Sequence, residues 1–165
     1  MNEYLTNLIE ALREELKQYG EMLALLEQQQ VLVMHRQSND LLNSVSGVNY
    51  QTAIMTSTRL EREECQRMLA RNLGLPDNAS FALILPELPP DYRPLMEALV
   101  QENNELLQRV QQRVRQNHLL LSHAVDLMQQ LINSIFPGAA PKTYDDCGRL
   151  PGNSMPHHSI YEAVG

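Results

Sequence analysis

An apolar residue recurs every seven positions along the first 35 residues of the chain. The series consists of Leu5, Leu12, Tyr19, Leu26 and Val33. A period of seven places these side chains on one face of an α-helix, whereas a half-buried strand would alternate every two residues. Further apolar residues beside the series make the stripe wider than a two-stranded coiled-coil seam. The pattern predicts one long helix over about residues 3–37 that belongs to a bundle.

The composition supports helices and argues against sheets. Of the 165 residues, 27 are Leu and 14 are Gln, while Trp is absent and Phe occurs only twice. A chain so poor in aromatic residues is a poor candidate for a β-sandwich or barrel, because strands favour aromatic and β-branched side chains.

Two more helices follow from the same periodicity. Ser38, Asn39 and Asp40 are helix-capping residue types and precede a weaker apolar stripe over about residues 40–73. Gly74 and Pro76 end that stripe, and the proline-containing stretch up to residue 90 is predicted to be a connector over the end of the bundle rather than a strand. The longest helical pattern covers about residues 91–136.

The predicted fold class is therefore all-α, with three long antiparallel helices in an elongated, coiled-coil-like bundle. The helical domain is predicted to cover residues 1–136. Residues 137–165 lack any apolar period and are predicted to form a flexible C-terminal tail. At about 1.5 Å per residue the third helix would outrun its partners after roughly Val125. Its most apolar part would then be exposed, which usually marks a binding surface.

Charge and hydropathy exclude several classes of function. The formal net charge of -7 argues against nucleic-acid binding, which needs clustered cations. Charges interrupt every apolar stretch long before 18 residues, so no membrane insertion is expected. The start of the chain has no basic region of a targeting segment, and a cytoplasmic location is predicted.

The residues that could carry chemistry do not form a recognisable active site. His35, His118 and His123 lie on predicted helices, but none is followed by the Lys-Gly step of phosphotransfer bundles. His157 and His158 are adjacent in the tail and lack the spacing of a stable metal site. No phosphate-binding glycine loop or nucleophile elbow occurs. We expect no enzyme activity, no catalytic residues, no metal and no cofactor.

Asn103 and Asn117 lie on the apolar face of the third helix, two heptads apart. A buried Asn can fix the register of packed helices, and it can also bind the backbone of a partner helix. Both interpretations stay open for each residue. The apolar stretch from Leu120 to Ile135 is likewise either intramolecular core or a groove for an amphipathic partner helix.

Three segments in the last third of the chain are similar to a known family. They are residues 103–107 (NNELL), residues 117–121 (NHLLL) and residues 143–149 (TYDDCGR). Together with the length of the chain, their order resembles the FlgN family of flagellar type III export chaperones. In that family a Leu-rich helical region precedes a Tyr-x-x-x-Gly step in the tail, matched here by Tyr144 and Gly148.

The resemblance implies a cytosolic chaperone that binds the C-terminal amphipathic helix of hook–filament junction proteins. It would prevent their premature association and deliver them to the cytoplasmic domain of the export gate. Tyr144 and Gly148 would contact the gate, and the free protein would be a monomer or weak dimer. The implied contacts with the substrate protein are Asn117, Leu120, Leu121, Ala124, Leu127, Met128, Leu131, Ile132 and Ile135.

A structural coiled-coil adaptor is the alternative interpretation of the same apolar stripes. Such an adaptor would oligomerise constitutively, whereas the chaperone would wait for its cargo as a monomer or weak dimer. The concentration dependence of its size would distinguish the two.

Overall fold

The computed structural model describes residues 2–35 and 38–135, and the regular elements of this part of the chain are all helices. Its elements are α1 (Asn2–Met34), α2 (Ser38–Asn72), α3 (Phe81–Ile84), the 3₁₀-helix η1 (Leu85–Glu87) and α4 (Arg93–Ile135). The all-α prediction is confirmed. The three long helices lie within a few residues of the predicted ranges, and Ser38, Asn39 and Asp40 form the first turn of α2 instead of preceding it.

The described part of the chain contains a fourth helix that the sequence did not predict. Residues 81–87 form α3 and η1 in place of an irregular connector. Ile84 and the following Leu88 are completely or almost completely buried. The segment is helical because helical hydrogen bonds satisfy its backbone groups internally. The same conformation lets these two apolar side chains reach the core.

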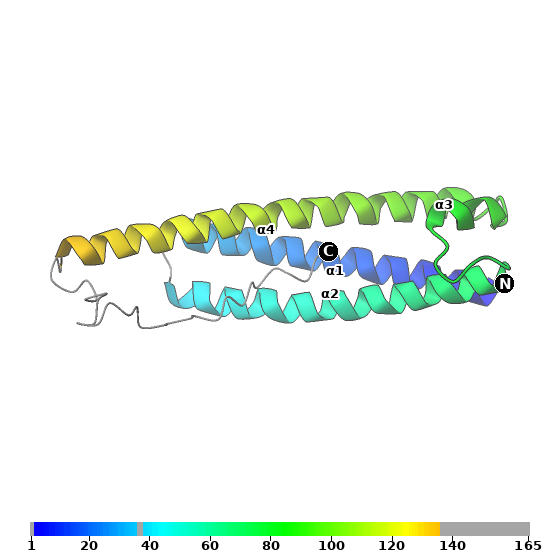
Figure 1. The fold of residues 1–165 in the computed structure, drawn as a ribbon, viewed down its shortest axis with the longest axis horizontal. Coiled ribbons are helices and arrows are strands. Elements are labelled where there is room, and N and C mark those ends of the chain that lie inside the picture. The colour runs from blue at the N-terminus through cyan, green and yellow to red at the C-terminus, as the bar shows by residue number, and fades with distance from the viewer. Residues whose placement is uncertain (1, 36–37, 136–165) are drawn as a thin grey trace, which may run out of the picture. The chain divides into compact units, whose positions relative to one another are not determined.

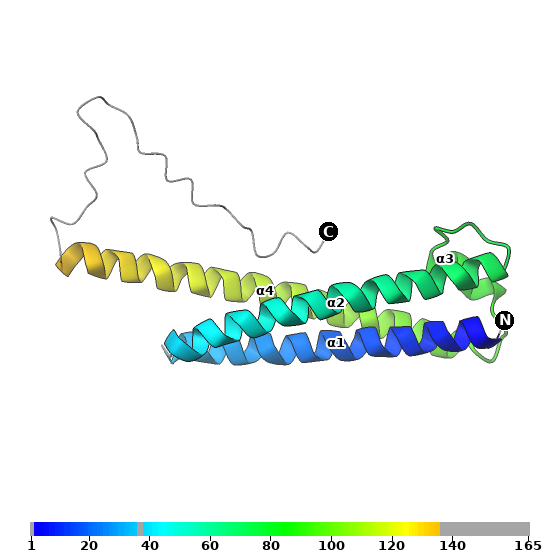
Figure 2. The same ribbon diagram turned by 90° about the horizontal axis from the view of Figure 1, so that it is seen from below.

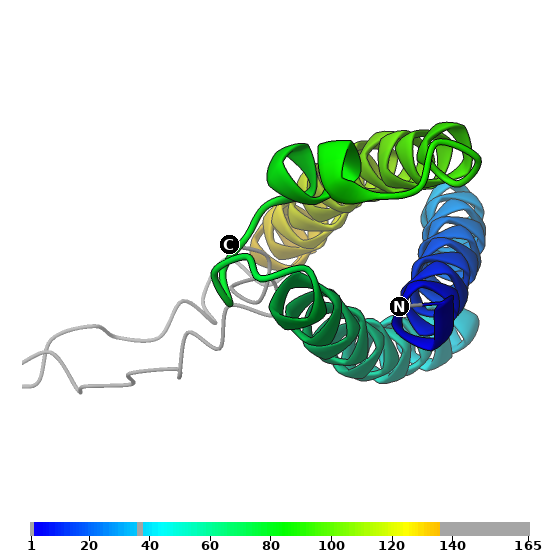
Figure 3. The ribbon, with the colours of Figure 1, turned by 90° about the vertical axis from the view of Figure 1, so that its right-hand side faces the viewer.

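The chain divides into two compact units, residues 1–118 and residues 119–165, with the boundary inside α4. In the first unit α1 and α2 form an antiparallel pair, and the beginning of α4 runs in the direction of α1 (Figures 1 and 2). Seen along the bundle, these three helices surround a common interior, with α3 and its flanking loops at one end (Figure 3).

Two apolar clusters fill this interior. The cluster at the end nearer α3 joins all four helices and includes Leu5, Leu8, Leu12, Leu69, Ile84, Met96 and Leu99. The second cluster contains Tyr19, Met22, Leu26, Val48 and Val110. Burial of such side chains is the main stabilising contribution to the bundle, at about 25 cal/mol per Å² of apolar surface.

The end of α2 is fixed by a glycine cap. Gly74 has a positive φ of 73°, a conformation that glycine adopts without steric cost. The N–H of Leu75 donates to the Ala70 carbonyl at 2.9 Å, and the N–H of Gly74 donates to the Arg71 carbonyl at 3.1 Å. These bonds satisfy carbonyls that the helix end would leave free and turn the chain toward α3.

The predicted division at residue 136, with a tail over residues 137–165, stays a prediction. The tail lies outside the described residues, and so does Phe136. Within the described ranges, none of the helices combines the length and the hydropathy that a bilayer span requires.

Candidate functional site

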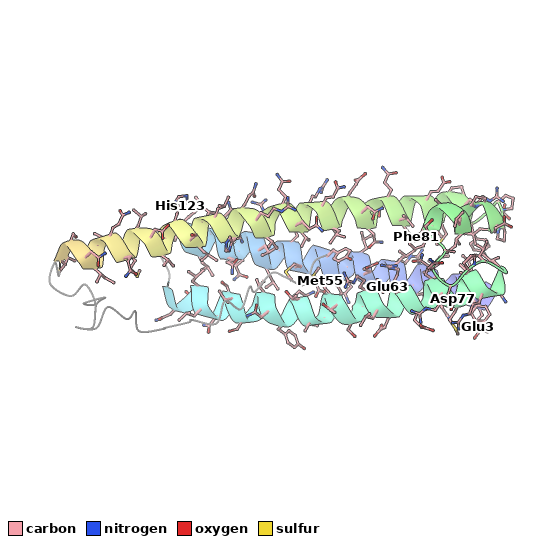
Figure 4. The ribbon with its side chains drawn as sticks, in the orientation of Figure 1. Glu3, Met55, Glu63, Asp77, Phe81 and His123 are labelled. Carbon is pink, nitrogen blue, oxygen red and sulfur yellow. The ribbon has the colours of Figure 1, made fainter. Side chains whose placement is uncertain are left out.

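The described part of the second unit is residues 119–135 of α4, and its apolar side chains are exposed. Met128 is 62% exposed and Leu131 is 60% exposed, while Ile135 is 65% exposed. The other large apolar side chains exposed in this segment are Leu119, Val125, Leu127 and Ile132. Figure 4 shows the side chains of this segment, where His123 is labelled.

Most of the predicted contact residues lie together on this segment. Leu127, Met128, Leu131, Ile132 and Ile135 are exposed, whereas Leu120, Leu121 and Ala124 are half-buried. Three or four residues separate neighbours along a helix face, so these side chains form one surface. We call the apolar surface of residues 120–135 the late α4 face.

Sequence reasoning missed Val125, which is 63% exposed and belongs to the late α4 face. The signal that could have found it is its spacing, because Val125 lies four residues after Leu121 and three before Met128. Its side chain therefore shares their side of the helix.

Asn117 is not on the late α4 face. Its side chain is completely buried in the first unit, where Nδ2 donates to the Leu26 carbonyl at 2.7 Å and to Gln29 Oε1 at 3.1 Å. The contact of Asn117 with a partner protein stays a prediction, and in this structure the side chain bonds to α1 instead. The residue contacts α1 because the apolar face of α4 up to this position packs into the bundle.

Asn103 repeats the arrangement of Asn117 two heptads earlier. Its Nδ2 donates to the carbonyl of Leu12 at 3.0 Å, and both Asn–carbonyl pairs join residues 91 positions apart. The constant offset shows that α1 and this part of α4 run parallel in a single register. Each Asn is a buried polar group whose bonds would break if α4 slipped by one heptad. The register interpretation is the one that these contacts support.

A polar layer, formed by Glu15, Arg62 and the hydroxyl of Tyr19, separates the two apolar clusters of the first unit. The carboxylate of Glu15 is buried and accepts hydrogen bonds from Arg62 Nε at 3.1 Å and from the Tyr19 hydroxyl at 2.8 Å. Burial of the phenol is the main reason that the pKa of Tyr19 lies well above its usual range, and the nearby negative charge of Glu15 raises it further. A cavity of about 120 Å³ adjoins the layer and is also lined by Asn103 and Phe81.

The ion pair in this layer joins α1 to α2. Its carboxylate is neutralised by the Arg62 guanidinium, which also lies 6.0 Å from the centre of the Phe81 ring. A buried ion pair with further hydrogen bonds compensates for the loss of hydration of both charges. The layer therefore contributes a defined arrangement of α1 against α2.

Among residues 2–35 and 38–135, the remaining chemically active side chains do not assemble into a metal centre. Within the described residues, no group of three or more His, Cys, Asp and Glu side chains could hold a metal ion. His118 and His123 are exposed on α4, and His35 is exposed in the turn after α1. Tyr144 and Gly148, the predicted gate contacts, lie outside the described residues, as do His157 and His158.

The fold and the late α4 face define a class of protein, namely a helical bundle with an exposed apolar face on one of its helices. A family model described as FlgN protein matches residues 1–152 of the chain. The chain belongs to the FlgN family, as its sequence suggested, and it is a flagellar export chaperone in the general sense of that family. Comparisons with curated proteins and with solved structures found no match.

Proposed function

We propose that this chaperone binds the C-terminal amphipathic helix of hook–filament junction proteins with its late α4 face. The observation that carries the proposal is the exposure of Leu127, Met128, Leu131 and Ile135 within one helical segment. A contiguous apolar surface of this kind on a protein in water is a typical binding surface for another apolar surface. The apolar face of an amphipathic helix is the partner that fits it.

The energy of such a complex comes from burial of the exposed side chains. Each Leu, Ile, Val or Met side chain that becomes fully buried contributes about 1.5–3 kcal/mol. Association opposes this with about 4–15 kcal/mol of lost translational and rotational freedom. Several side chains of the late α4 face must therefore be covered together, and the cargo helix would be masked along most of its apolar face.

Masking explains how the chaperone would act without chemistry. A junction protein whose terminal helix is covered cannot associate through that helix, and it stays in a state that can be exported. The chaperone would then deliver it to the cytoplasmic domain of the export gate. This role requires a cytoplasmic location and a free form that is a monomer or weak dimer.

The proposal is tested by titration calorimetry against a peptide that copies the C-terminal helix of a junction protein from the same cell. The double variant Leu127→Asp with Leu131→Asp places two charges on the late α4 face. We expect it to lower the affinity at least about 100-fold, since each buried carboxylate would lose its hydration. Its helicity should match that of the unchanged protein by circular dichroism.

The matched control is the double variant Gln129→Asp with Asn133→Asp, whose two positions are both exposed. It adds the same charge with the same four-residue spacing to the opposite, polar side of the segment. We expect unchanged affinity from the control. Unchanged affinity in the Leu127→Asp, Leu131→Asp variant would contradict the proposal. If the protein also formed a stable oligomer by light scattering, the structural adaptor would become the better explanation.

Docking at the export gate is a separate part of the proposal and rests on Tyr144 and Gly148. Tyr144→Ala should weaken binding to the cytoplasmic domain of the gate and leave cargo affinity near normal. The two affinities are measured separately with the purified full chain. Equal gate affinity for the variant and the unchanged protein would remove Tyr144 from this role.

A further inference from the structure

The late α4 face is wider than one helix–helix contact needs. On a helix with 100° per residue, its side chains spread from Leu127 to Val125 over an arc of about 160°. The opposite arc carries the polar residues, and Leu119 is the one apolar residue within it. A two-stranded coiled coil uses a narrow seam with apolar residues at alternating intervals of three and four.

The arc consists of two such seams side by side. The first seam contains Leu121, Val125, Met128, Ile132 and Ile135, at intervals of four, three, four and three. The second seam contains Leu120, Ala124, Leu127 and Leu131, at intervals of four, three and four. Their centres are about 90° apart around the helix axis. Each helix of a four-helix bundle likewise packs against two neighbouring helices that lie in directions about 90° apart around its axis.

The second seam continues a register that α4 already uses in the first unit. Met96, Asn103, Val110 and Asn117 are buried there at intervals of seven, and Ala124 and Leu131 are the next two members of that series. The same α4 register therefore packs against α1 in the first unit and presents apolar side chains for a helix in the second.

The first seam uses two heptad positions, and one of them becomes apolar only after the unit boundary. The position of Leu121, Met128 and Ile135 is already apolar in the first unit, where Val100, Leu107 and Val114 pack against the two clusters. The heptad position of Val125 and Ile132 is occupied earlier in α4 by Asn104, Gln111 and His118. Asn104 and His118 are exposed, so a polar side chain suits this position in the first unit. The change from polar to apolar at this one position widens the apolar face only within residues 119–135, where both positions of the first seam are apolar.

We propose that the late α4 face binds two amphipathic helices of one cargo protein at once, one on each seam. The inference rests on the proposed function and adds to it the class of cargo, a protein that presents a second amphipathic helix beside its C-terminal helix. Two helices are needed because one partner would cover a single seam and leave the other seam in water.

The test compares one substitution at each outer edge of the face. Leu127→Gln changes the edge of the second seam, and Val125→Gln changes the edge of the first. Leu119→Gln is the matched control, since Leu119 is 61% exposed in the same segment but lies outside both seams. Gln is a good helix former, so all three variants should retain helicity.

The full-length junction protein is titrated into the full-length chaperone. We expect each edge variant to lower the affinity about tenfold and Leu119→Gln to leave it unchanged. We also expect the thermal midpoint of the free chaperone to be the same for all three variants, since neither edge is buried without cargo. The free chaperone should also stay monomeric by sedimentation.

Three results would overturn the two-helix inference. Loss of affinity at only one edge would mean that a single helix binds. A lower thermal midpoint for one edge variant would mean that the chain itself covers that seam. A chaperone dimer that one edge variant dissociates would assign that seam to a second copy. Failure of the proposed function is distinguishable, because both edge variants and Leu127→Asp with Leu131→Asp would then keep unchanged affinity.

Discussion

Two stretches of α4 share one apolar heptad register and differ in what covers it. In the first unit, Met96 and Val110 are buried and Asn103 and Asn117 donate hydrogen bonds to carbonyls of α1. In the second unit, Leu131 continues the register and Leu127 lies beside it in the same seam, and both are more than half exposed. The comparison teaches that an apolar period in the sequence predicts a helix face whose burial is favourable. The period does not predict whether the element that packs on this face belongs to the same chain or to another protein.

The largest expected effect tests this comparison directly with one substitution in each stretch of apolar surface. Leu99→Ala removes a buried side chain from the first stretch of α4 and should lower the free energy of unfolding by about 3 kcal/mol. Leu131→Ala removes an exposed one and should change it by less than about 0.5 kcal/mol. Urea denaturation measures both. Equal losses would show that residues 119–135 are packed in the free protein.

An intermediate effect is expected from the polar layer between the two apolar clusters. Arg62→Leu leaves the buried Glu15 carboxylate without its cation and should destabilise the fold by about 2 kcal/mol. Arg67→Leu is the control, since Arg67 pairs with Glu64 at the surface and should cost less than about 0.5 kcal/mol. If both variants unfold at the same urea concentration, the layer does not stabilise the bundle.

The smallest expected effect concerns the pH dependence of the same layer. Because burial raises the pKa of Tyr19, its contribution to stability is complete below the unfolded value of about 10 and is lost as the pH rises further. Tyr19→Phe should therefore cost about 1 kcal/mol at pH 8, from the lost bond to Glu15, and should show a weaker fall in stability between about pH 10 and 11.

Tyr50→Phe is the control for this measurement, because Tyr50 is 71% exposed on α2. Urea midpoints at a series of alkaline pH values should fall in parallel for Tyr50→Phe and the unchanged protein. A parallel fall for Tyr19→Phe as well would mean that other groups dominate the alkaline unfolding.

Much of the fold could be predicted from the chain because its signals are local. The heptad series from Leu5 to Val33 requires no knowledge of any partner helix, and the glycine that ends α2 acts on its own backbone. The late α4 face could be located for the same reason, since its apolar residues are neighbours along one helix. The role of α3 could not be predicted from the sequence, because a run of five apolar residues is too short to show a period. Its burial also depends on contacts with all the other helices.

By itself, the sequence determined that this protein is helical, where its long helices lie and which residues of α4 form a continuous apolar register. Only the tertiary structure decided that Asn103 and Asn117 bind carbonyls of α1, that Arg62 neutralises Glu15, and that Ile84 completes the core. The physical reason is distance along the chain. Helix periodicity can be recognised within a short stretch of sequence. Each of these contacts, by contrast, joins residues that are far apart in the sequence and meet only when the bundle folds.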